Sequence, residues 1–199
     1  MKKIFIIFAL FIIQISFVNA QTLSGEVTFD WISKTQMERD ENINEIRDEI
    51  FTDDLVFDYG KKEFKAMYQD KIKDSSRINN YNEISQGKKE DKDKYYCGFF
   101  WKKYLVAYGI QYKNKPDENL YYDAMGNLKW VDRYSPEYPN FPYTSYQYNI
   151  KGELRAVYYF NSKYDQYIYD ENGKFKGRWY KDKMYDRKAK VIMTRSNWD

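Results

Sequence analysis

The sequence contains no histidine and only one cysteine, Cys97. Histidine is the commonest general base and a favoured zinc ligand, so its absence excludes Ser-His and Cys-His nucleophile pairs and the usual zinc sites. A single cysteine forms neither an internal disulfide nor a thiolate metal centre, so stability has to come from a core. Because aromatic residues surround Cys97, we expect a buried and inert thiol, with pairing to another chain as the alternative.

Motifs of common catalytic and cofactor sites are also missing. The chain has no G-x-S-x-G, no P-loop and no G-x-G-x-x-G. Residues 170–173, which read DENG, resemble part of a calcium loop, but the later ligands are absent and a hairpin turn explains the pattern. We therefore expect no cofactor and no metal, and the sequence favours a protein that is not an enzyme.

Long hydrophobic runs are confined to the N-terminus. Lys2 and Lys3 precede an apolar run over residues 4–18, and Val18-Asn19-Ala20 follows the small-residue pattern of a signal-peptide cleavage site. The run is short for a membrane helix, which needs about 20 apolar residues, and an uncleaved anchor is the alternative. We expect residues 1–20 to be a signal peptide. The remaining chain would have no transmembrane span and would be periplasmic, at the cell surface or secreted.

Neither sign of charge is in excess. Without Lys2 and Lys3, 31 basic residues face 30 acidic ones, a net charge of +1. Such a balance gives no overall attraction to nucleic acid or membranes, so an electrostatic site has to be local, and no nucleic-acid partner is expected. Aromatic residues, by contrast, are abundant, with 22 Tyr, 13 Phe and 5 Trp. Disordered segments are poor in such residues, so the chain is expected to fold.

The chain divides into two parts that are expected to form one compact domain. In residues 21–94, period-two alternation predicts a strand at 24–31, and apolar spacing predicts a helix over 34–51 and a second helix after Gly60. From 95 to 199, aromatic strands alternate with turn residues. The charged segment at 85–94 is the expected solvated, flexible link between the two parts.

Three segments of the second part share one frame, in which Tyr is followed by Asp or Asn, two spacers, Gly and, two positions later, an apolar residue. They are residues 122–128, 148–154 and 169–175. Asp or Asn in the first position and Gly in the last predict a type I turn followed by a glycine bulge. Each segment is therefore expected to close a β-hairpin.

The turn geometry also predicts which residues face each other. The expected pairs are Tyr122 with Leu128, Tyr121 with Lys129 and Leu120 with Trp130, and by the same count Tyr148 with Leu154 and Tyr169 with Phe175. Aromatic and aliphatic partners on one face indicate a packing face.

Cations would occupy the opposite face. Lys129, Arg155 and Lys176 fall at one repeat position and would form a row across stacked hairpins. A solvated face is the alternative, because exposed charges usually serve solubility alone. The functional interpretation is a groove for an anionic chain or a sugar polymer, with Tyr rings as stacking platforms. Further residues expected on this face are Tyr121, Tyr159, Tyr180, Arg178, Arg133 and Lys174.

Three of the four prolines lie in one loop, residues 135–146. Their fixed backbones would stiffen a loop that also presents Tyr138, Phe141 and Tyr143. We expect this loop to cover the sheet edge with aromatic anchors, to act as a pre-stiffened binding loop, or to do both. Tyr138 and Tyr143 therefore join the candidate ligand-binding residues.

The repeated frame resembles the YD repeats of bacterial secreted and cell-wall proteins and, more loosely, MORN-like hairpin repeats. The resemblance covers about residues 120–180, whereas the N-terminal half resembles no family. It implies the hairpin geometry and, because some YD repeats have been proposed to bind carbohydrate, a glycan ligand. The residues that carry the resemblance are Tyr122, Asp123, Gly126, Leu128, Tyr148, Asn149, Gly152, Leu154, Tyr169, Asp170, Gly173 and Phe175.

These observations predict an α+β protein, in which an N-terminal strand and two helices pack on a C-terminal antiparallel β-meander of repeated hairpins. They favour an exported, non-catalytic binding or surface-interaction protein, whose partner would be an extracellular glycan, an anionic envelope polymer or a protein. One alternative is a small secreted polysaccharide hydrolase that uses an Asp/Glu pair. The other is a structural module that binds a protein partner.

Overall fold

The computed structural model describes residues 41–51 and 61–196. The expected signal peptide, the strand expected at residues 24–31 and the first part of the helix expected over 34–51 lie outside these described residues.

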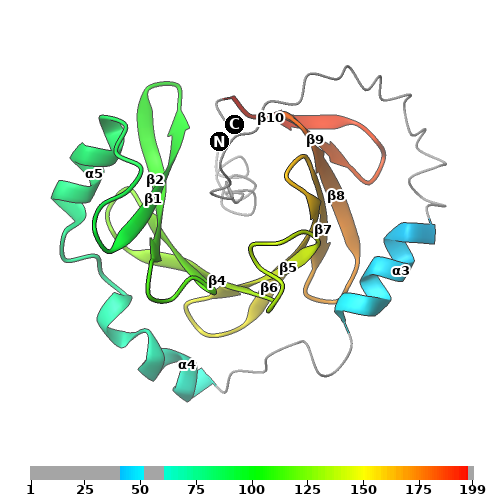
Figure 1. The fold of residues 1–199 in the computed structure, drawn as a ribbon, viewed down its shortest axis with the longest axis horizontal. Helices are drawn as coiled ribbons and strands as arrows, with labels where there is room; N and C mark the ends of the chain where they lie inside the picture. Colours follow the sequence, from blue (N-terminus) through cyan, green and yellow to red (C-terminus); the bar gives the residue numbers. More distant parts are fainter. Residues whose placement is uncertain (1–40, 52–60, 197–199) are drawn as a thin grey trace, which may run out of the picture.

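Ten strands form one antiparallel sheet, in which each strand pairs with the next along the chain. The sheet is strongly curved and open, since its two edge strands, β1 and β10, do not pair with each other (Figure 1). The predicted meander is confirmed in this coarse form, and strands make up most of the regular secondary structure in the described residues. The strands are β1 (Lys94–Trp101), β2 (Tyr104–Tyr112), β3 (Glu118–Asp123), β4 (Leu128–Tyr134), β5 (Tyr143–Asn149), β6 (Leu154–Ser162), β7 (Asp165–Asp170), β8 (Phe175–Tyr180), β9 (Lys183–Asp186) and β10 (Val191–Thr194).

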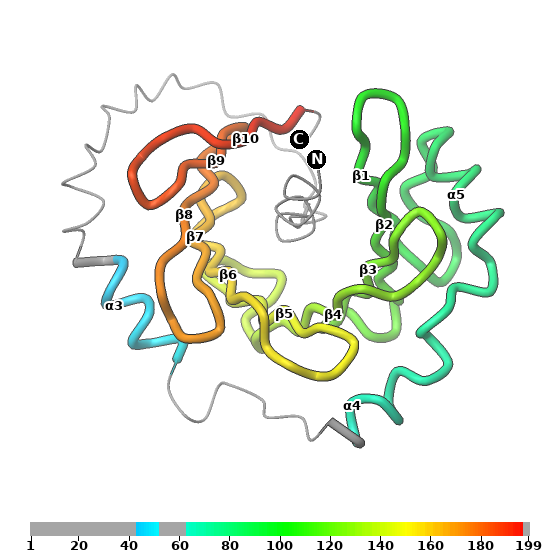
Figure 2. Tube along the Cα trace, turned by 180° about the vertical axis from the view of Figure 1, so that it is seen from behind, coloured from blue at the N-terminus to red at the C-terminus, as the bar shows by residue number. Residues whose placement is uncertain are grey.

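The described helices all precede the sheet and lie on its convex side, as the views from the front and from behind both show (Figures 1 and 2). They are α3 (Glu41–Ile50), α4 (Lys61–Met67), the short 3-10 helix η1 (Gln69–Lys71) and α5 (Arg77–Ser85). Helices in the two predicted regions are present as α3 and α4. The sequence analysis missed α5, because its asparagine-rich sequence has weak helix propensity and little apolar periodicity.

The convex face of the sheet carries the main hydrophobic core. Ile43, Ile50 and Phe64 of the helices pack there against strand residues that include Tyr122, Tyr148 and Tyr169. The predicted pairs Tyr122–Leu128, Tyr148–Leu154 and Tyr169–Phe175 are confirmed, and all of these side chains belong to or pack against this core.

Beyond these first pairs, the predicted register is wrong by one residue. Tyr121 lies opposite Trp130 and not Lys129, and Leu120 lies opposite Val131. The cause is a β-bulge in each repeat: the residue after the first apolar partner pairs with no residue on the facing strand. Trp130 consequently shares the concave side with Tyr121 and is not on the packing face.

The repeat glycines do more than close the turns. Gly126, Gly152 and Gly173 all have φ between +73° and +77°, a region that favours glycine. An added Cβ at Gly126 would lie 2.7 Å from Arg77 Cγ of α5, and one at Gly152 would lie 2.8 Å from Phe64 Cβ of α4. At Gly173 the nearest atom would be Arg47 Cγ of α3, at 3.2 Å. Each hairpin turn thus seats one helix, and the glycine allows the close approach.

A fourth turn of the same design joins β9 to β10. Asp186 Oδ1 accepts the backbone N–H groups of Lys188 (2.8 Å) and Lys190 (2.9 Å), as Asp170 Oδ1 does for Asn172 and Lys174. Ala189, at φ 58°, takes the position of the glycine. This repeat was not predicted from the sequence, because Ala189 stands where the other repeats have glycine.

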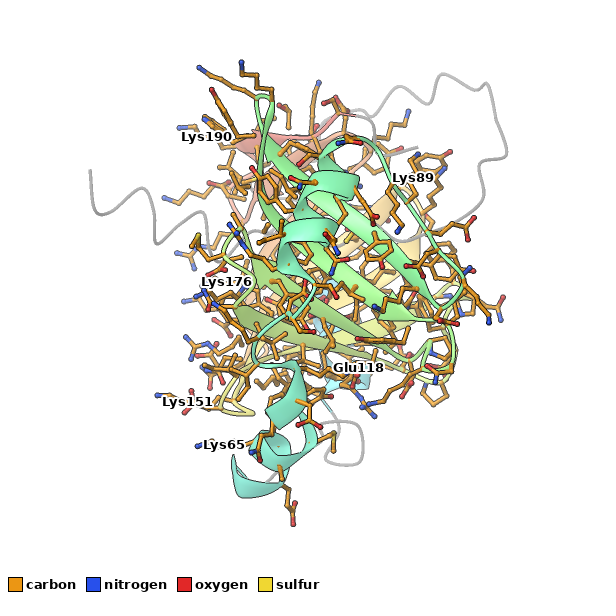
Figure 3. All side chains as sticks on the ribbon, turned by 90° about the vertical axis from the view of Figure 1, so that its left-hand side faces the viewer. Lys65, Lys89, Glu118, Lys151, Lys176 and Lys190 are labelled. Atoms are coloured by element: carbon orange, nitrogen blue, oxygen red, sulfur yellow. The ribbon has the colours of Figure 1, made fainter. Side chains whose placement is uncertain are left out.

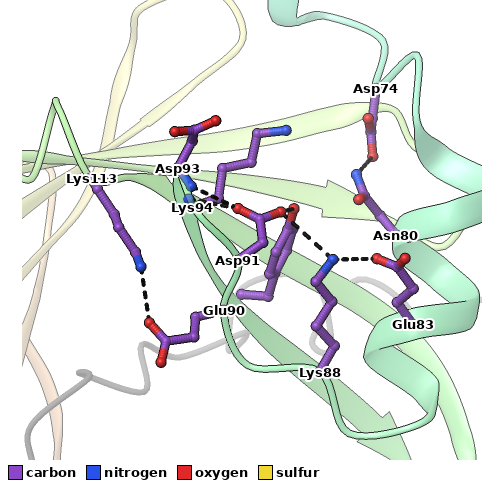
Figure 4. A network of polar contacts seen from close by, with 10 residues as sticks. Asp74, Asn80, Glu83, Lys88, Glu90, Asp91, Asp93, Lys94 and Lys113 are labelled. Atoms are coloured by element: carbon purple, nitrogen blue, oxygen red, sulfur yellow. Dashed lines mark hydrogen bonds and ion pairs between the residues drawn. The ribbon is translucent and has the colours of Figure 1, made fainter.

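The charged segment predicted as a loop at residues 85–94 is a loop over residues 86–93, between α5 and β1, and it has many polar contacts (Figure 4). Asp91 accepts hydrogen bonds from the Tyr96 hydroxyl at 2.5 Å and from two backbone N–H groups, and Lys88 forms an ion pair with Glu83 at 2.6 Å. The Tyr96 bond, with help from those backbone donors, lowers the pKa of Asp91 to about 2. The loop is therefore anchored at its α5 end and at its β1 end.

Candidate functional site

Every second turn of the meander lies at the same end of the strands, because neighbouring strands are antiparallel. We call this end the turn rim. In Figure 3, three of its residues, Lys151, Lys176 and Lys190, lie towards one end of the strands, and Glu118 lies towards the other end. The turn rim consists of residues 101–104, 123–129, 149–155, 170–176 and 186–191.

The turn rim is rich in exposed positive charge. It contains ten Lys or Arg side chains, all of them exposed, and five Asp or Glu side chains. Three of these acids, Asp123, Asp170 and Asp186, accept backbone N–H groups of their own turns. The near balance of charge in the whole chain therefore hides a local excess of cations. The cations are Lys102, Lys103, Lys129, Lys151, Arg155, Lys174, Lys176, Arg187, Lys188 and Lys190.

The predicted row of Lys129, Arg155 and Lys176 lies on this rim. Each is the bulge residue at the start of β4, β6 or β8, so the three recur at every second strand, roughly 10 Å apart. Lys129 lies 3.1 Å from Asp123, and Lys176 lies 3.6 Å from Asp170. Such exposed pairs contribute little free energy, so both ammonium groups remain available to a ligand.

Three other predicted site residues have structural roles on the convex side. Arg178 forms a two-point ion pair with Asp165, at 2.6 and 2.9 Å, and its guanidinium lies 4.6 Å from the centre of the Tyr167 ring. Tyr159 is buried in the helix-covered core. Tyr180 is half-buried, with the Arg178 guanidinium 5.9 Å from its ring centre. These residues therefore do not join the row of cations.

The remaining predicted residues, Tyr121, Tyr138 and Tyr143, lie on the concave side. Tyr143 stacks on Phe160 with ring centres 4.6 Å apart, and Tyr138 meets it edge-on at 5.0 Å. The proline-rich loop that carries Tyr138 joins β4 to β5, which are central strands. It packs against a hydrophobic cluster on the concave side that includes Tyr143 and Phe160. The expectation that this loop covers a sheet edge was wrong in that respect, because the edges are β1 and β10.

The concave side also holds a buried polar cluster that the sequence analysis missed. Asn119, Asp132 and Gln147 are cross-strand neighbours on β3, β4 and β5, and none is more than 4 % exposed. Asn119 Nδ2 donates to the Tyr121 hydroxyl at 3.0 Å, and the Tyr158 hydroxyl donates to Gln147 Oε1 at 3.4 Å. Within the described chain, Asn119 Oδ1 and Gln147 Nε2 have no hydrogen-bond partner. The sequence signal that could have revealed this cluster is a polar residue at an inward-facing position of a strand that is otherwise rich in aromatic residues.

Burial dominates the electrostatics of this cluster. It raises the pKa values of the Tyr134 and Tyr158 hydroxyls, and the carboxylate of Asp132 raises them further. Burial also raises the pKa of Cys97 to about 12, which agrees with the predicted buried thiol.

Three carboxylates are buried in the described residues, and they do not form a catalytic pair. Glu118 accepts hydrogen bonds from Lys115 (2.8 Å), Arg133 (2.9 Å) and the Tyr68 hydroxyl. Asp165 is held by Arg178, also on the convex side, which leaves Asp132 as the one buried acid of the concave side among residues 41–51 and 61–196. In the same residues, no cluster of potential metal ligands occurs, and no helix is long and apolar enough to cross a membrane.

Comparison with protein-family models, with curated proteins and with solved structures gives no match to this chain. The resemblance to YD and MORN-like repeats therefore stays a prediction, and the geometry of the chain itself has to carry the functional argument.

Proposed function

We propose that this chain is an exported, non-catalytic binding protein whose turn rim binds an anionic polymer of the cell envelope. The supporting observation is the recurrence of one exposed cation per hairpin, at Lys129, Arg155 and Lys176. Contacts that are weak singly add up when a ligand presents many charges at once. A polymer with repeated carboxylate or phosphate groups fits such an array.

A binding role also agrees better with the side chains present than hydrolysis does. Polysaccharide hydrolysis needs two carboxyl groups on either side of the scissile bond. Of the buried acids described above, two are held in ion pairs on the helix-covered side. Glu45, Asp48 and Glu49 of α3 are exposed, as expected for the solvated face of an amphipathic helix.

The test is binding of polyglutamate and of polyphosphate to the full chain and to two triple variants. K129A/R155A/K176A removes the row, whereas the control K89A/K92A/K183A removes three exposed lysines from the opposite end of the strands. Loss of three contacts of about 0.5–1 kcal/mol each predicts a decrease in affinity of about 10-fold or more for the first variant. The control should stay within about twofold. Equal affinities for the two variants would reject the proposed site.

A second candidate function is supported by the buried polar cluster. Asn119 Oδ1 is an unpaired acceptor and Gln147 Nε2 an unpaired donor beside Asp132, with aromatic rings close by; both atoms are buried, so a sugar would have to enter the concave side to reach them. Hydroxyl groups of a neutral sugar donate and accept together, and their C–H faces pack on rings, so a short glycan suits this chemistry. Binding to a neutral oligosaccharide array should be lost in Q147A and kept in K129A/R155A/K176A. The opposite pattern would assign glycan binding to the turn rim.

A further inference from the structure

Exposed apolar side chains gather at one corner of the molecule, around the hairpin that joins β1 to β2. Trp101 and Tyr104 form a cross-strand pair at its tip and are 55 % and 59 % exposed. Phe100 and Val106 adjoin them and are also exposed. Large apolar side chains that are exposed together often mark an interaction site.

The next turn and α5 extend this apolar corner. The backbone N–H of Ala124 donates to the Val106 carbonyl at 3.1 Å, which places the β3–β4 turn beside β2. Arg77 of α5 donates to the Ala124 carbonyl and contacts Met125 Sδ, at 3.0 and 3.7 Å. Met125 is 59 % exposed, and Ile78, which follows Arg77 in α5, is 66 % exposed. We call this surface the tip patch, made up of Phe100, Trp101, Tyr104, Val106, Met125 and Ile78.

Positive charge surrounds the tip patch. Lys102 and Lys103 lie between Trp101 and Tyr104, and Lys103 Nζ lies 5.5 Å from the centre of the Tyr104 ring. Arg77 borders Met125. A partner with acidic groups around an apolar centre would complement this arrangement, whereas a second copy of the patch would be repelled.

One edge of β1 is protected along only half of its length. Next to the loop, Tyr95 pairs with Glu90, and the Tyr96 N–H donates to the Lys89 carbonyl at 2.7 Å. From Cys97 to Phe100, the outer edge pairs with no other described strand. Such an edge is a template for an added strand.

We propose that the tip patch and the adjacent edge of β1 at Cys97–Phe100 bind an extended acidic segment of a partner protein by strand addition. The segment would pair with β1 at Cys97–Phe100, insert apolar side chains against Phe100 and Trp101, and place its carboxylates near Lys102 and Lys103. This site is distinct from the cation row, because it depends on rings and on a strand edge.

A bilayer surface fits the tip patch less well. Lipid would favour apolar side chains at the tips of all five rim turns, but the fourth turn exposes Glu171 and Asn172 and the fifth exposes Arg187 and Lys188. The residue types of the patch, Trp, Tyr, Phe and Met beside Arg, are those enriched in the cores of protein interfaces.

The test uses a displayed library of random peptides, selected on the full chain. Enriched peptides should combine Asp or Glu with large apolar residues, and the affinity of the best peptide should fall about 10-fold or more in W101S/Y104S. Both substitutions are at exposed sites, so the fold should survive, which circular dichroism can check. The K129A/R155A/K176A variant should bind the peptide as the wild type does.

Amide exchange locates the contact. Bound peptide should slow exchange at residues 97–100 and leave exchange at β10, the other edge strand, unchanged. Three results would overturn the inference: peptides without acidic residues, equal peptide affinity in W101S/Y104S, or protection elsewhere. So would Trp101-dependent binding to phosphatidylglycerol vesicles in place of peptides. Failure of the inference would leave the polyglutamate and polyphosphate results for K129A/R155A/K176A untouched.

Discussion

At the scale of single residues, the most informative positions are those at the end of each rim turn. Gly126, Gly152, Gly173 and Ala189 share one left-handed backbone conformation, yet one of them carries a side chain. A left-handed conformation costs an L-residue about 1–2 kcal/mol. Glycine avoids this cost, but it loses more conformational entropy on folding, which offsets part of the gain. The fourth turn therefore stores a penalty that the first three avoid.

Ala189→Gly should stabilise the protein. We expect the free energy of unfolding to rise by about 0.5–1 kcal/mol, because glycine adopts the φ of 58° without strain. Chemical denaturation with the midpoint and slope fitted separately measures the change. A decrease would show that the Ala189 methyl group stabilises the turn in another way.

The reverse change in the second turn should be costly. In Gly152→Ala the new methyl carbon would lie 2.8 Å from Phe64 Cβ at a φ of +77°. Strain and crowding together predict a loss of about 2–4 kcal/mol in the free energy of unfolding. Chemical denaturation of this variant and of Ala189→Gly measures the two opposite changes in unfolding free energy at equivalent positions. An unchanged unfolding free energy in Gly152→Ala would contradict the close packing of α4 on this turn.

Asp91 should make stability depend on pH. Its pKa is lowered from 3.8 to about 2, so it contributes stability that is fully present above pH 3.8 and is lost as pH falls towards 2. The difference in unfolding free energy between the wild type and Asp91→Asn should thus be constant above about pH 5 and fall steeply between about pH 4 and pH 2. Urea denaturation across this range measures it, and a difference that persists undiminished at pH 2 would assign the effect to lost geometry and not to charge.

At the scale of elements, α5 depends on a single carboxylate. Asp74 accepts hydrogen bonds from the Tyr108 hydroxyl of β2 (2.6 Å), from Asn80 Nδ2 (2.7 Å) and from the backbone N–H of Ser76 (2.9 Å). It therefore ties Ser76, which precedes the helix, and Asn80 within the helix to the sheet. Because α5 has weak intrinsic propensity, these bonds and its packing have to supply its stability.

Removal of this carboxylate should free α5 without unfolding the sheet. Asp74→Ala is expected to lower the free energy of unfolding by about 2–4 kcal/mol, since it leaves buried donors unsatisfied. Amide exchange should accelerate most at residues 77–85 and remain slow in the central strands. Uniform acceleration over the whole chain would mean that α5 and the sheet unfold as one unit.

The sequence predicts the strands and turns of this fold far better than the helices or the register. Turn chemistry is local, so Asp123, Asn149 and Asp170 with their glycines were enough to place three hairpins. The bulges are a two-strand property that residue counting does not include, and this moved Trp130 to the concave side. The helix α5 is stabilised by tertiary contacts, so its own sequence carries little signal.

For the candidate site, the sequence located the cation row and misjudged its companions. Lys129, Arg155 and Lys176 share a repeat position, which the fold preserves. Arg178 and Tyr159 alternate onto the helix-covered side, where Arg178 pairs with Asp165 of the neighbouring strand and Tyr159 is buried in the core, so composition could not show that they are structural. The buried cluster at Asn119 and Gln147 became visible only once three strands were aligned.

At the scale of the whole molecule, the fold divides its surface by role. The convex side is covered by helices, each seated on one turn glycine (Figure 1). The end of the strands that carries these turns also collects the exposed cations, although the chain as a whole is close to neutral. The repeat thus builds the core and exposes positive charge with the same few residues. The proposed binding function depends on the exposed charge.

Salt dependence tests that function most directly. Attraction between a cation array and an anionic polymer is screened by salt, so the affinity of the wild type for polyphosphate should fall steeply with ionic strength. The slope should be clearly shallower for K129A/R155A/K176A and unchanged for K89A/K92A/K183A. Parallel slopes for all three proteins would contradict the assignment of the turn rim as the binding surface.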